Sequence, residues 1–450
     1  MSFPADTIAA LATPVGTAAL ALIRASGPAA STLVQEIFAR APLPRQAQHA
    51  DYRDLQGVLI DDVLFTFFAN PNSFTGEDSL EISCHGNPFI AQKILADLLA
   101  RGCRSAEAGE FSKRAFLNGR LDLSQAEAVM DLIHARSDQA LAAANQQLRG
   151  SLGRHMAELS TLLIKTLAHV EAYIDFPEED LPTENRQNID KDIDTLIINT
   201  DRLLATSHYG ALLRNGIKTV ILGEPNAGKS SLLNCLVGRE RALVSSEPGT
   251  TRDYLEELII VGPYCLRLID TAGLNPKPAL LEKRGIEKSR EQAAEADLFL
   301  WVIDATRPRP DLPSEFSQHL TAKNTLVVYN KCDLPVIDPS PLSQPFQCVN
   351  ISALTITGLT TLQDALAKMA SSFQVNVGSE VIAINTRHTQ SLEQAKKCLL
   401  AAKIKLAENV HSELLSSDLM TALESFAQIS GKIDHERILD ELFATFCIGK

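Results

Sequence analysis

The sequence predicts three kinds of fold along one chain: an α+β domain, an all-α domain in two parts, and an α/β domain inserted between those parts. Apolar runs alternate with turn clusters over residues 1–118. Residues 119–213 and 376–450 both carry long helical periodicity, whereas residues 214–375 alternate short β-branched runs with helical stretches. Alternation of that last kind is typical of a parallel sheet covered by helices.

Bulk composition limits what the chain can be. Its 450 residues predict more than one domain, and 45% apolar residues suffice for packed cores. The formal charge of −13 argues against a global positive field, so an RNA partner requires a local basic patch or a second protein. Eight cysteines without a CxxC pair indicate free thiols in a reducing cytosol. With no apolar run that could span a bilayer and no cationic leader, we expect a cytoplasmic protein without a membrane segment.

The N-terminal domain and the helical domain follow from local patterns. The stretch "FANPNSFTGEDSLEISCHGNP" has turn residues at both ends and a strand-like "SLEIS" inside, which favours an α+β fold. Ser124 with Glu127 three residues later is a capping-box signature and predicts a helix start. The apolar stripe that follows contains Val129, Leu132, Ile133, Leu141, Ala144 and Leu148. Similar periodicity returns from about residue 380, so the helical domain is expected to be discontinuous.

A phosphate-binding loop opens the inserted domain. The stretch "TVILGEPNAGKSSLLN" reads as a strand, then Gly223-x4-Gly228-Lys229-Ser230, then a helix. Glycines let main-chain N–H groups approach phosphate oxygens, and the helix N-terminus adds a favourable dipole. We expect Lys229 to reach the β- and γ-phosphates and the Ser230 hydroxyl to bind Mg²⁺.

Four further motifs follow in order, each at a strand end or in a switch loop. In "LRLIDTAG", Asp270 can hold Mg²⁺ through water and the Gly273 amide can meet the γ-phosphate. "GTTRD" supplies Thr250 and Thr251, and a threonine that binds Mg²⁺ only beside a γ-phosphate makes a switch.

The last two motifs, "TLVVYNKCD" and "VNISAL", predict a guanine pocket. The Asp333 carboxylate can accept from guanine N1–H and the exocyclic amine, a donor pair that adenine lacks. A main-chain N–H at Ser352–Ala353 can meet guanine O6. We therefore expect GTP to be bound by these residues: Asn226, Ala227, Gly228, Lys229, Ser230, Ser231, Ser245, Ser246, Glu247, Pro248, Gly249, Thr250, Thr251, Asp270, Thr271, Ala272, Gly273, Asn330, Lys331, Asp333, Ser352 and Ala353. Mg²⁺ is expected on Ser230 and Thr251.

The residue that orients water is not given by these motifs. Ras-like proteins place a glutamine after "DTAG", but Leu274 occupies that position and cannot hydrogen-bond through its side chain. Asn226 could bind a monovalent cation through its carbonyl, or it could be a turn residue. Glu282 could orient water as a base, or it could lie on a solvated helix face.

The chain resembles the MnmE (TrmE) family of tRNA-modification GTPases over essentially its whole length. The stretches that carry the resemblance include "DTIAALATPVG", "NSFTGEDSLEI", "GEFSKRAFLNGRLDLSQAEAV", "IDFPEED", "GEPNAGKSSLLN", "GTTRD", "DTAGL" and the terminal "CIGK". The resemblance implies an α+β N-terminal domain that binds folate and dimerises, a discontinuous all-α helical domain, and an inserted α/β P-loop GTPase domain. It also implies that a flavoprotein partner, MnmG, which carries FAD, joins the homodimer to add an aminomethyl-type group to carbon 5 of the wobble uridine in tRNA. A tetrahydrofolate derivative would supply the carbon.

The family pattern assigns further roles by resemblance. It implies a K⁺ ion held by Asn226, Ser245, Glu247 and Thr250, and a water-orienting acid at Glu282. It also implies folate contacts at Arg24, Glu81, Arg120 and Lys450, although both arginines would serve equally in surface salt bridges. The chain departs from the family at Thr17-Ala18-Ala19 after Gly16, at Asn87 after Gly86, and at Asn275.

The terminal "FCIGK" raises a separate hypothesis. Cys447 could be a small hydrophobic residue at a helix end, as buried free cysteines often are. Alternatively, a tail anchored by Ile438, Leu439, Leu442, Phe443 and Phe446 carries Lys450 to the folate, with Cys447 near the transferred carbon as a nucleophile or acid/base.

Two other functions share these motifs. A ribosome-assembly GTPase normally carries a basic RNA-binding domain, which an acidic chain does not show. A folate-dependent one-carbon transferase with a regulatory GTPase domain is the other.

Overall fold

The computed structural model describes residues 6–175, 183–240, 256–270, 294–310, 318–337, 346–375, 382–408 and 412–431, together with Phe443, Phe446 and Gly449. It divides into two compact units. One comprises Met1–Met130 with Ala427–Lys450, and the other comprises Asp131–Phe426. Each unit is described by itself.

The first unit is built on a mixed sheet in the order β3-β4-β5-β2-β1-β6. Its strands are β1 (Ile8–Leu11), β2 (Leu20–Ser26), β3 (Ala47–Arg53), β4 (Leu59–Phe68), β5 (Ser79–His85) and β6 (Arg104–Ser105). Neighbouring strands are antiparallel except β1 and β6, which are parallel. Helices α1 (Ala30–Phe38) and α2 (Pro88–Ala100) cover one face, where alternate strand residues are buried. The "SLEIS" segment lies in β5, as the sequence predicts.

Two helices complete this unit, α3 (Glu110–Leu117) and the first part of α4 (Leu123–His134). The predicted capping box at Ser124 and Glu127 is wrong, because Ser124 lies inside α4 and donates to Asp122 Oδ1 at 2.7 Å. The box is formed instead by Asp122 and Gln125. Asp122 Oδ1 accepts from Gln125 N–H at 2.8 Å, and Gln125 Oε1 accepts from Asp122 N–H at 2.9 Å. A carboxylate two residues earlier satisfies the same spacing and is the stronger acceptor.

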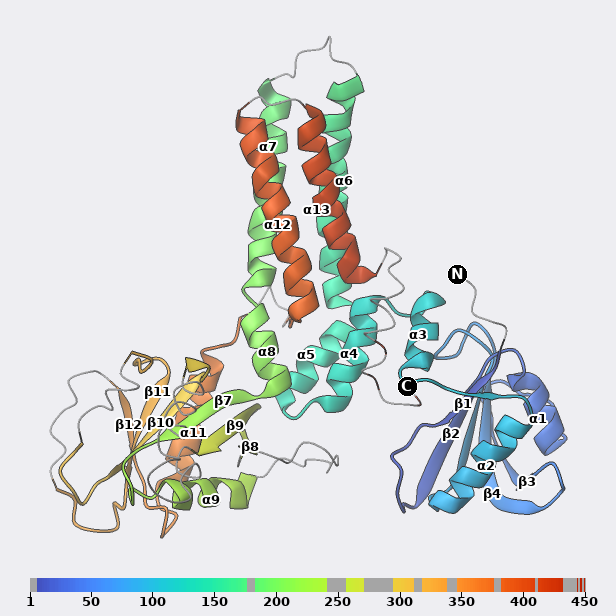
Figure 1. The fold of residues 1–450 in the computed structure, drawn as a ribbon, viewed down its shortest axis with the longest axis horizontal. Helices are drawn as coiled ribbons and strands as arrows, with labels where there is room; N and C mark the ends of the chain where they lie inside the picture. Colours follow the sequence, from blue (N-terminus) through green and yellow to red (C-terminus); the bar gives the residue numbers. More distant parts are fainter. Residues whose placement is uncertain are drawn as a thin grey trace, which may run out of the picture. The chain divides into compact units, whose positions relative to one another are not determined.

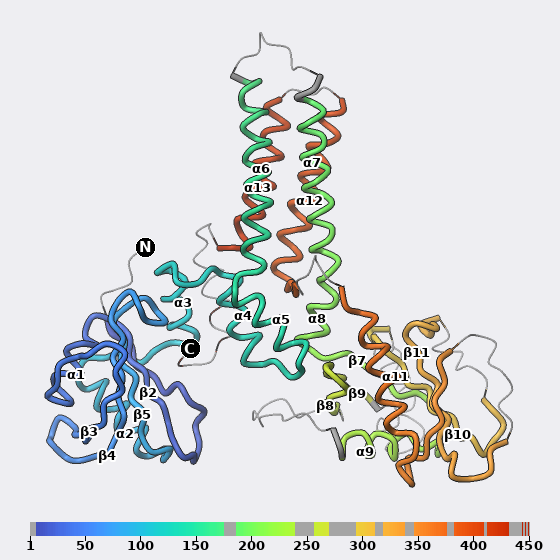
Figure 2. Tube along the Cα trace, turned by 180° about the vertical axis from the view of Figure 1, so that it is seen from behind, coloured from blue at the N-terminus to red at the C-terminus, as the bar shows by residue number. Residues whose placement is uncertain are grey.

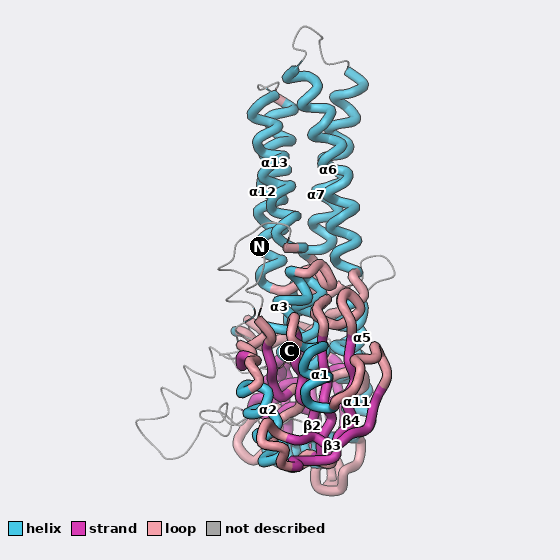
Figure 3. The backbone as a smooth tube through the Cα atoms, turned by 90° about the vertical axis from the view of Figure 1, so that its right-hand side faces the viewer, coloured by secondary structure: helices cyan, strands magenta, loops and turns pink. Residues whose placement is uncertain are grey.

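The second unit contains a helical bundle. Helices α5 (Asp138–Leu148) and α8 (Ser207–Asn215) are short, whereas α6 (Ser151–Asp175), α7 (Thr183–Leu204), α12 (Thr386–Ala407) and α13 (Ser412–Ser430) are long. The long helices run side by side although two precede and two follow the inserted domain (Figures 1 and 2). Figure 3 shows the four long helices, α6, α7, α12 and α13, in cyan. Ion pairs across α12 join it to its neighbours: Lys396–Asp201, Lys403–Asp194 and Lys405–Asp418.

The inserted domain is an α/β sheet in the order β12-β11-β10-β7-β9-β8. Its strands are β7 (Ile217–Leu222), β8 (Glu256–Val261), β9 (Tyr264–Asp270), β10 (Leu298–Asp304), β11 (Thr325–Asn330) and β12 (Gln347–Asn350). All neighbours are parallel except β8 and β9. Every residue of β7 and β10 is buried, which is typical of a parallel sheet covered on both faces. Helices α9 (Lys229–Glu240) and α11 (Leu359–Ser371) pack into the same apolar core.

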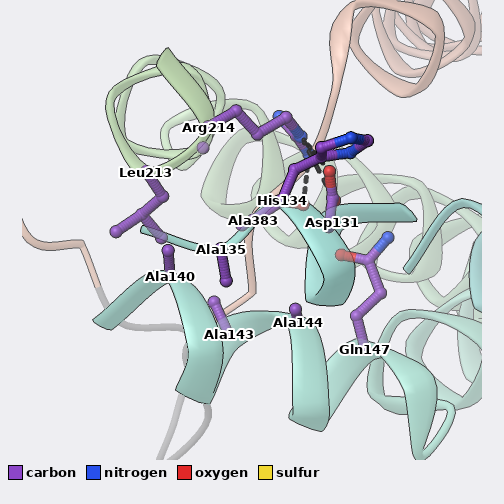
Figure 4. Close-up of a pocket in the computed structure, with 11 residues that line it drawn as sticks. Asp131, His134, Ala135, Ala140, Ala143, Ala144, Gln147, Leu213, Arg214 and Ala383 are labelled. Atoms are coloured by element: carbon purple, nitrogen blue, oxygen red, sulfur yellow. Dashed lines mark hydrogen bonds and ion pairs between the residues drawn. The ribbon is translucent and has the colours of Figure 1, made fainter. Parts of the chain in front are cut away.

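Arg214 lies in α8, the helix that leads into this sheet, and binds the segment that leaves it. Its Nε lies 3.0 Å and 3.2 Å from the carboxylate oxygens of Asp131 in α4. Its terminal nitrogens donate to the carbonyls of Ile384 and Ala383, both at 3.1 Å, on the return segment before α12. A cavity of about 200 Å³ lies here, and five of its eleven lining residues are alanines (Figure 4).

The predicted fold class is therefore confirmed: an α+β domain, a discontinuous helical domain and an inserted α/β domain. None of the described helices is long and apolar enough to cross a membrane.

Candidate functional site

The phosphate loop lies between β7 and α9, in the predicted strand–loop–helix context. Lys229, the first residue of α9, is 8% exposed. Its Nζ donates to the main-chain carbonyls of Gly223 at 2.8 Å and Glu224 at 2.9 Å. Ser230 and Ser231 follow on the exposed first turn of the helix. The ammonium is therefore held within the loop that should bind the phosphates, and a hydroxyl oxygen of the kind that suits Mg²⁺ stands at the helix N-terminus.

Asn330, at the end of β11, joins three of the predicted segments. Asn330 is buried, with 2% of the residue exposed. The amide Nδ2 donates to the carbonyl of Ala227 in the phosphate loop at 2.9 Å, and Oδ1 accepts from the N–H of Ala353 at 3.0 Å. Gly228 has φ +96°, and a Cβ there would lie 2.1 Å from Asn330 Nδ2. The closeness of this contact explains why glycine is required at residue 228.

The remaining residues predicted to bind the base surround this junction. Lys331 has a left-handed backbone with φ 67°, and its Nζ donates to Asp304 Oδ2 at 2.6 Å. Asp333 is exposed on the following turn. Ser352 is 1% exposed and its hydroxyl accepts from the N–H of Thr355 at 3.1 Å, which shapes the loop after β12. The structure thus brings the described phosphate and base residues to the carboxyl ends of β7, β11 and β12, where parallel sheets bind ligands.

Asn226 lies exposed in the phosphate loop with φ 65°. Asparagine is one of the few residues with a Cβ that adopt this conformation readily, so the backbone fits a turn role. The exposed side-chain amide also leaves an oxygen donor at the loop surface, which suits a monovalent cation. Both roles of the residue are compatible with this geometry.

Several predicted residues lie outside the described residues. They comprise the switch segment Ser245, Ser246, Glu247, Pro248, Gly249, Thr250 and Thr251, the side chain of Asp270, then Thr271, Ala272, Gly273, Leu274, Glu282, Cys447 and Lys450.

The candidate folate residues lie in the first unit. Arg24 on β2 faces Glu81 on β5, with its Nε at 2.9 Å and Nη2 at 2.7 Å from Glu81 Oε1. The guanidinium lies 5.7 Å from the ring centroids of both Phe74 and Phe111. Arg120 is exposed on the turn between α3 and α4. A cation, a carboxylate and two aromatic rings at one place are groups that can bind a pterin and an acidic tail.

Two of the three departures from the family pattern, at residues 17–19 and at Asn87, meet at one point of this unit, and the third, Asn275, lies outside the described residues. Ala18 N–H donates to the carbonyl of Gly86 at 2.9 Å, and Gly86 N–H donates to the carbonyl of Ala19 at 3.1 Å. Asn87 caps α2, because its side-chain oxygen accepts from Phe89 N–H at 2.9 Å. The loop is therefore held by main-chain bonds, and the asparagine serves the following helix.

The described residues of the C-terminal tail also pack within the first unit. Phe443 and Phe446 are 2% and 6% exposed and share a cluster with Leu123 and Ala126. A Cβ at Gly449 (φ +92°) would lie 2.4 Å from the carbonyl oxygen of Leu11. Leu11 ends β1, whose preceding residue pairs with Arg24. The tail therefore lies at the end of the strand beside Arg24.

Sequence reasoning missed Asp304. The available signal was an aspartate at the end of the apolar run "LFLWVID", the same arrangement that singles out Asp270.

Comparison with known proteins covers the whole chain. A family model described as the GTP-binding protein TrmE N-terminus matches residues 7–120, and one described as the MnmE helical domain matches residues 123–447. The tRNA modification GTPase MnmE of Opitutus terrae is 58% identical over 449 residues, covering 99% of each chain. The protein of that name from Akkermansia muciniphila is 42% identical over 456 residues, covering 100% of each chain.

Among solved structures, the G domain of the T. maritima FeoB iron transporter is 24% identical and covers 35% of this chain and 98% of its own. The TM-score is 0.24, too low to support an argument about this chain. The match to two family models and to full-length relatives shows that the chain belongs to the MnmE family of tRNA modification GTPases.

Proposed function

We propose that this chain hydrolyses GTP in the modification of the tRNA wobble uridine, and that tRNA is its macromolecular substrate. The observation that carries the GTP part is the junction at Asn330, where one buried amide binds both the phosphate loop and the loop that carries Ala353. Such a junction links the expected base pocket to the phosphate loop, so that one nucleotide can contact both. The expected domain limits at residues 118, 213 and 375 are part of this proposal.

In this proposal the nucleotide contacts divide by chemistry. Asp333 accepts from the guanine edge, and the Ala353 N–H, which donates to Asn330 Oδ1 in this structure, would be shared with guanine O6. Lys229 exchanges its loop carbonyls for phosphate oxygens, because a doubly charged phosphate is the stronger acceptor. Ser230 and Thr251 would hold Mg²⁺, which neutralises phosphate charge during transfer.

The proposal includes K⁺ stimulation of hydrolysis. Leu274 cannot orient water, so charge and water must be supplied by other groups. Asn226, Ser245, Glu247 and Thr250 would hold K⁺, which supplies positive charge at the phosphates. Glu282 would orient the attacking water. The exposed amide of Asn226 supports the first of these roles.

The proposal also assigns a folate-dependent step to a cytoplasmic homodimer that acts with an FAD-containing flavoprotein of the MnmG type. Tetrahydrofolate derivatives supply one-carbon units when bound. Arg24, Glu81, Arg120 and Lys450 would bind the folate, and Cys447 would lie near the reacting carbon. Support comes from the ion pair of Arg24 with Glu81 and from Gly449, which lies beside the strand next to Arg24.

The test is mass spectrometry of tRNA wobble uridines from a deletion strain, complemented with wild type or with Cys447→Ser. Loss of the carboxymethylaminomethyl-type group in the deletion strain, restored by wild type, supports the proposal. Unchanged wobble uridines would favour a ribosome-assembly GTPase or a one-carbon transferase of another kind. If Cys447→Ser restores modification fully, the cysteine has only a packing role.

A further inference from the structure

Asp304 ends β10 beside the segment expected to bind the base. It is 9% exposed and lies opposite Asn330 in the parallel register of β10 and β11. Figure 1 shows these two strands side by side in the inserted domain. Because ligands of open α/β sheets bind at the carboxyl ends of the strands, this carboxylate stands at the edge where the nucleotide is expected.

The two oxygens of this carboxylate bind two different elements. Oδ1 accepts from Thr306 N–H at 3.0 Å and from the Thr306 hydroxyl at 2.7 Å, which orients the carboxylate from the turn that follows β10. Oδ2 accepts from Lys331 Nζ at 2.6 Å, and Arg307 Nε lies 3.7 Å away. Burial acts to raise the pKa of Asp304, but the bonds from Lys331 and Thr306 outweigh it and lower the pKa to about 2. The group is therefore a carboxylate at neutral pH.

Lys331 needs such a partner because its backbone is strained. Its φ of 67° lies in the left-handed region, which is unfavourable for a residue with a Cβ. The residue stands between Asn330 and the turn that carries Asp333. That turn is closed by Leu334 N–H, which donates to the Lys331 carbonyl at 3.1 Å.

Main-chain bonds connect the same two segments. Ala305 N–H donates to the Asn330 carbonyl at 2.9 Å, and Ile337 N–H donates to the Ala305 carbonyl at 3.0 Å. Hydrogen bonds therefore join the end of β10 to the base-binding turn at three residues of that turn: Asn330, Lys331 and Ile337. A side chain that fixes Lys331 therefore influences both the Asn330 junction and the direction of Asp333.

We propose that Asp304 is a positioning residue for the nucleotide: through Lys331 Nζ it holds the left-handed turn that presents Asp333 to guanine. Asp304 itself makes no contact with the base. The inference rests on the proposed GTP function and extends it to a residue outside the nucleotide motifs.

The test is a double-mutant cycle on nucleotide affinity with Asp304→Asn, Lys331→Met and the combined variant. We expect each single change to weaken GDP and GTP binding by about tenfold, the scale of one hydrogen bond to a charged group. We expect the double variant to be no weaker than the weaker single variant, because both changes remove one shared interaction. At saturating GTP the turnover of Asp304→Asn stays close to wild type, so KM changes and kcat does not.

Two further variants keep the test decisive. Thr306→Val removes the hydroxyl that orients the carboxylate, and it should weaken GTP binding in the wild type but not in a Lys331→Met background. Asp364→Asn removes an exposed carboxylate from α11 as a matched control and should leave affinity unchanged. Thermal unfolding of each variant identifies any that fail to fold. If Asp304→Asn fails to fold, Thr306→Val takes its place in the cycle.

Additive losses, or wild-type GTP affinity in folded Asp304→Asn, would overturn the role of Asp304. Failure of the wild-type chain to bind and hydrolyse GTP would instead overturn the proposed function, whatever the cycle shows.

Discussion

The base end of the candidate nucleotide site is held by a buried amide that binds main-chain groups, whereas the candidate folate site centres on a partly exposed ion pair. Asn330 is 2% exposed and satisfies a carbonyl and an N–H from two loops. The side chains of Arg24 and Glu81 are 19% and 27% exposed and pair across neighbouring strands. Removing the buried amide leaves two main-chain partners unsatisfied, whereas removing Arg24 leaves one carboxylate that water can still reach. Substitutions in the first site should therefore lower both stability and nucleotide affinity, whereas substitutions in the second should lower folate affinity more than stability.

The largest effect is expected for Asn330→Ala. Two main-chain groups, the carbonyl of Ala227 and the N–H of Ala353, would lose their partner, at about 1–3 kcal/mol each. We expect GTP affinity to fall by about a hundredfold or more, together with a lower thermal unfolding midpoint. Asn199→Ala on α7, whose amide donates to Thr195, is the matched control. Normal nucleotide affinity in Asn330→Ala would contradict a shared junction.

Asp333→Asn should change base preference rather than structure, because Asp333 is exposed. The amide presents a donor to guanine N1–H and fits a xanthine carbonyl instead. Loss of two charge-assisted bonds predicts a roughly hundredfold drop in GTP affinity with a gain for XTP. Competition binding with both nucleotides measures the exchange. A variant that retains full GTP preference would show that the base pocket lies elsewhere.

Asn226→Ala should abolish K⁺ stimulation of hydrolysis while GTP binding persists. The expected loss is about 10- to 100-fold in kcat, since one donor to developing charge can contribute about a hundredfold or more. Turnover in KCl and NaCl at matched ionic strength is the measurement. Equal rates in both salts for the wild type would reject the cation role. Glu282→Ala, compared in parallel, should slow hydrolysis without weakening GTP binding.

Arg24→Ala should show the separation expected of the folate site. Because the side chains are only 19% and 27% exposed and the guanidinium lies beside Phe74 and Phe111, loss of Arg24 should cost about 1–3 kcal/mol in the free energy of unfolding, less than the loss of a fully buried pair. Folate affinity should nevertheless fall by about tenfold, the scale of one charge-assisted bond. Deletion of residues 447–450 should weaken folate binding and leave GTP hydrolysis intact. A large stability loss with unchanged folate affinity in Arg24→Ala would make the pair structural.

Contiguous motifs make the position of the candidate nucleotide residues in the fold predictable from sequence. The phosphate loop and the segment from Asn330 to Asp333 each follow a buried strand, so their position at the sheet edge follows from local patterns. Asp304 was not predicted, because its bond to Lys331 joins residues 27 positions apart and belongs to no motif. The sequence predicts the cap of α4 at Ser124 rather than at Asp122, because each of these residues has a Glu or Gln three positions later. The contact of Gly449 with Leu11 joins the two ends of the chain, which periodicity cannot reveal.

The most direct test of the account is the nucleotide preference of the purified full-length chain in KCl with Mg²⁺. Initial rates of hydrolysis are measured for GTP with ATP or XTP as competitor, and affinities for the corresponding diphosphates are measured by calorimetry. The account predicts that GTP is hydrolysed, that neither competitor reduces its rate at equal concentration, and that GDP alone binds. Comparable hydrolysis or binding of adenine nucleotides would contradict a guanine pocket built on Asn330, Lys331 and Asp333.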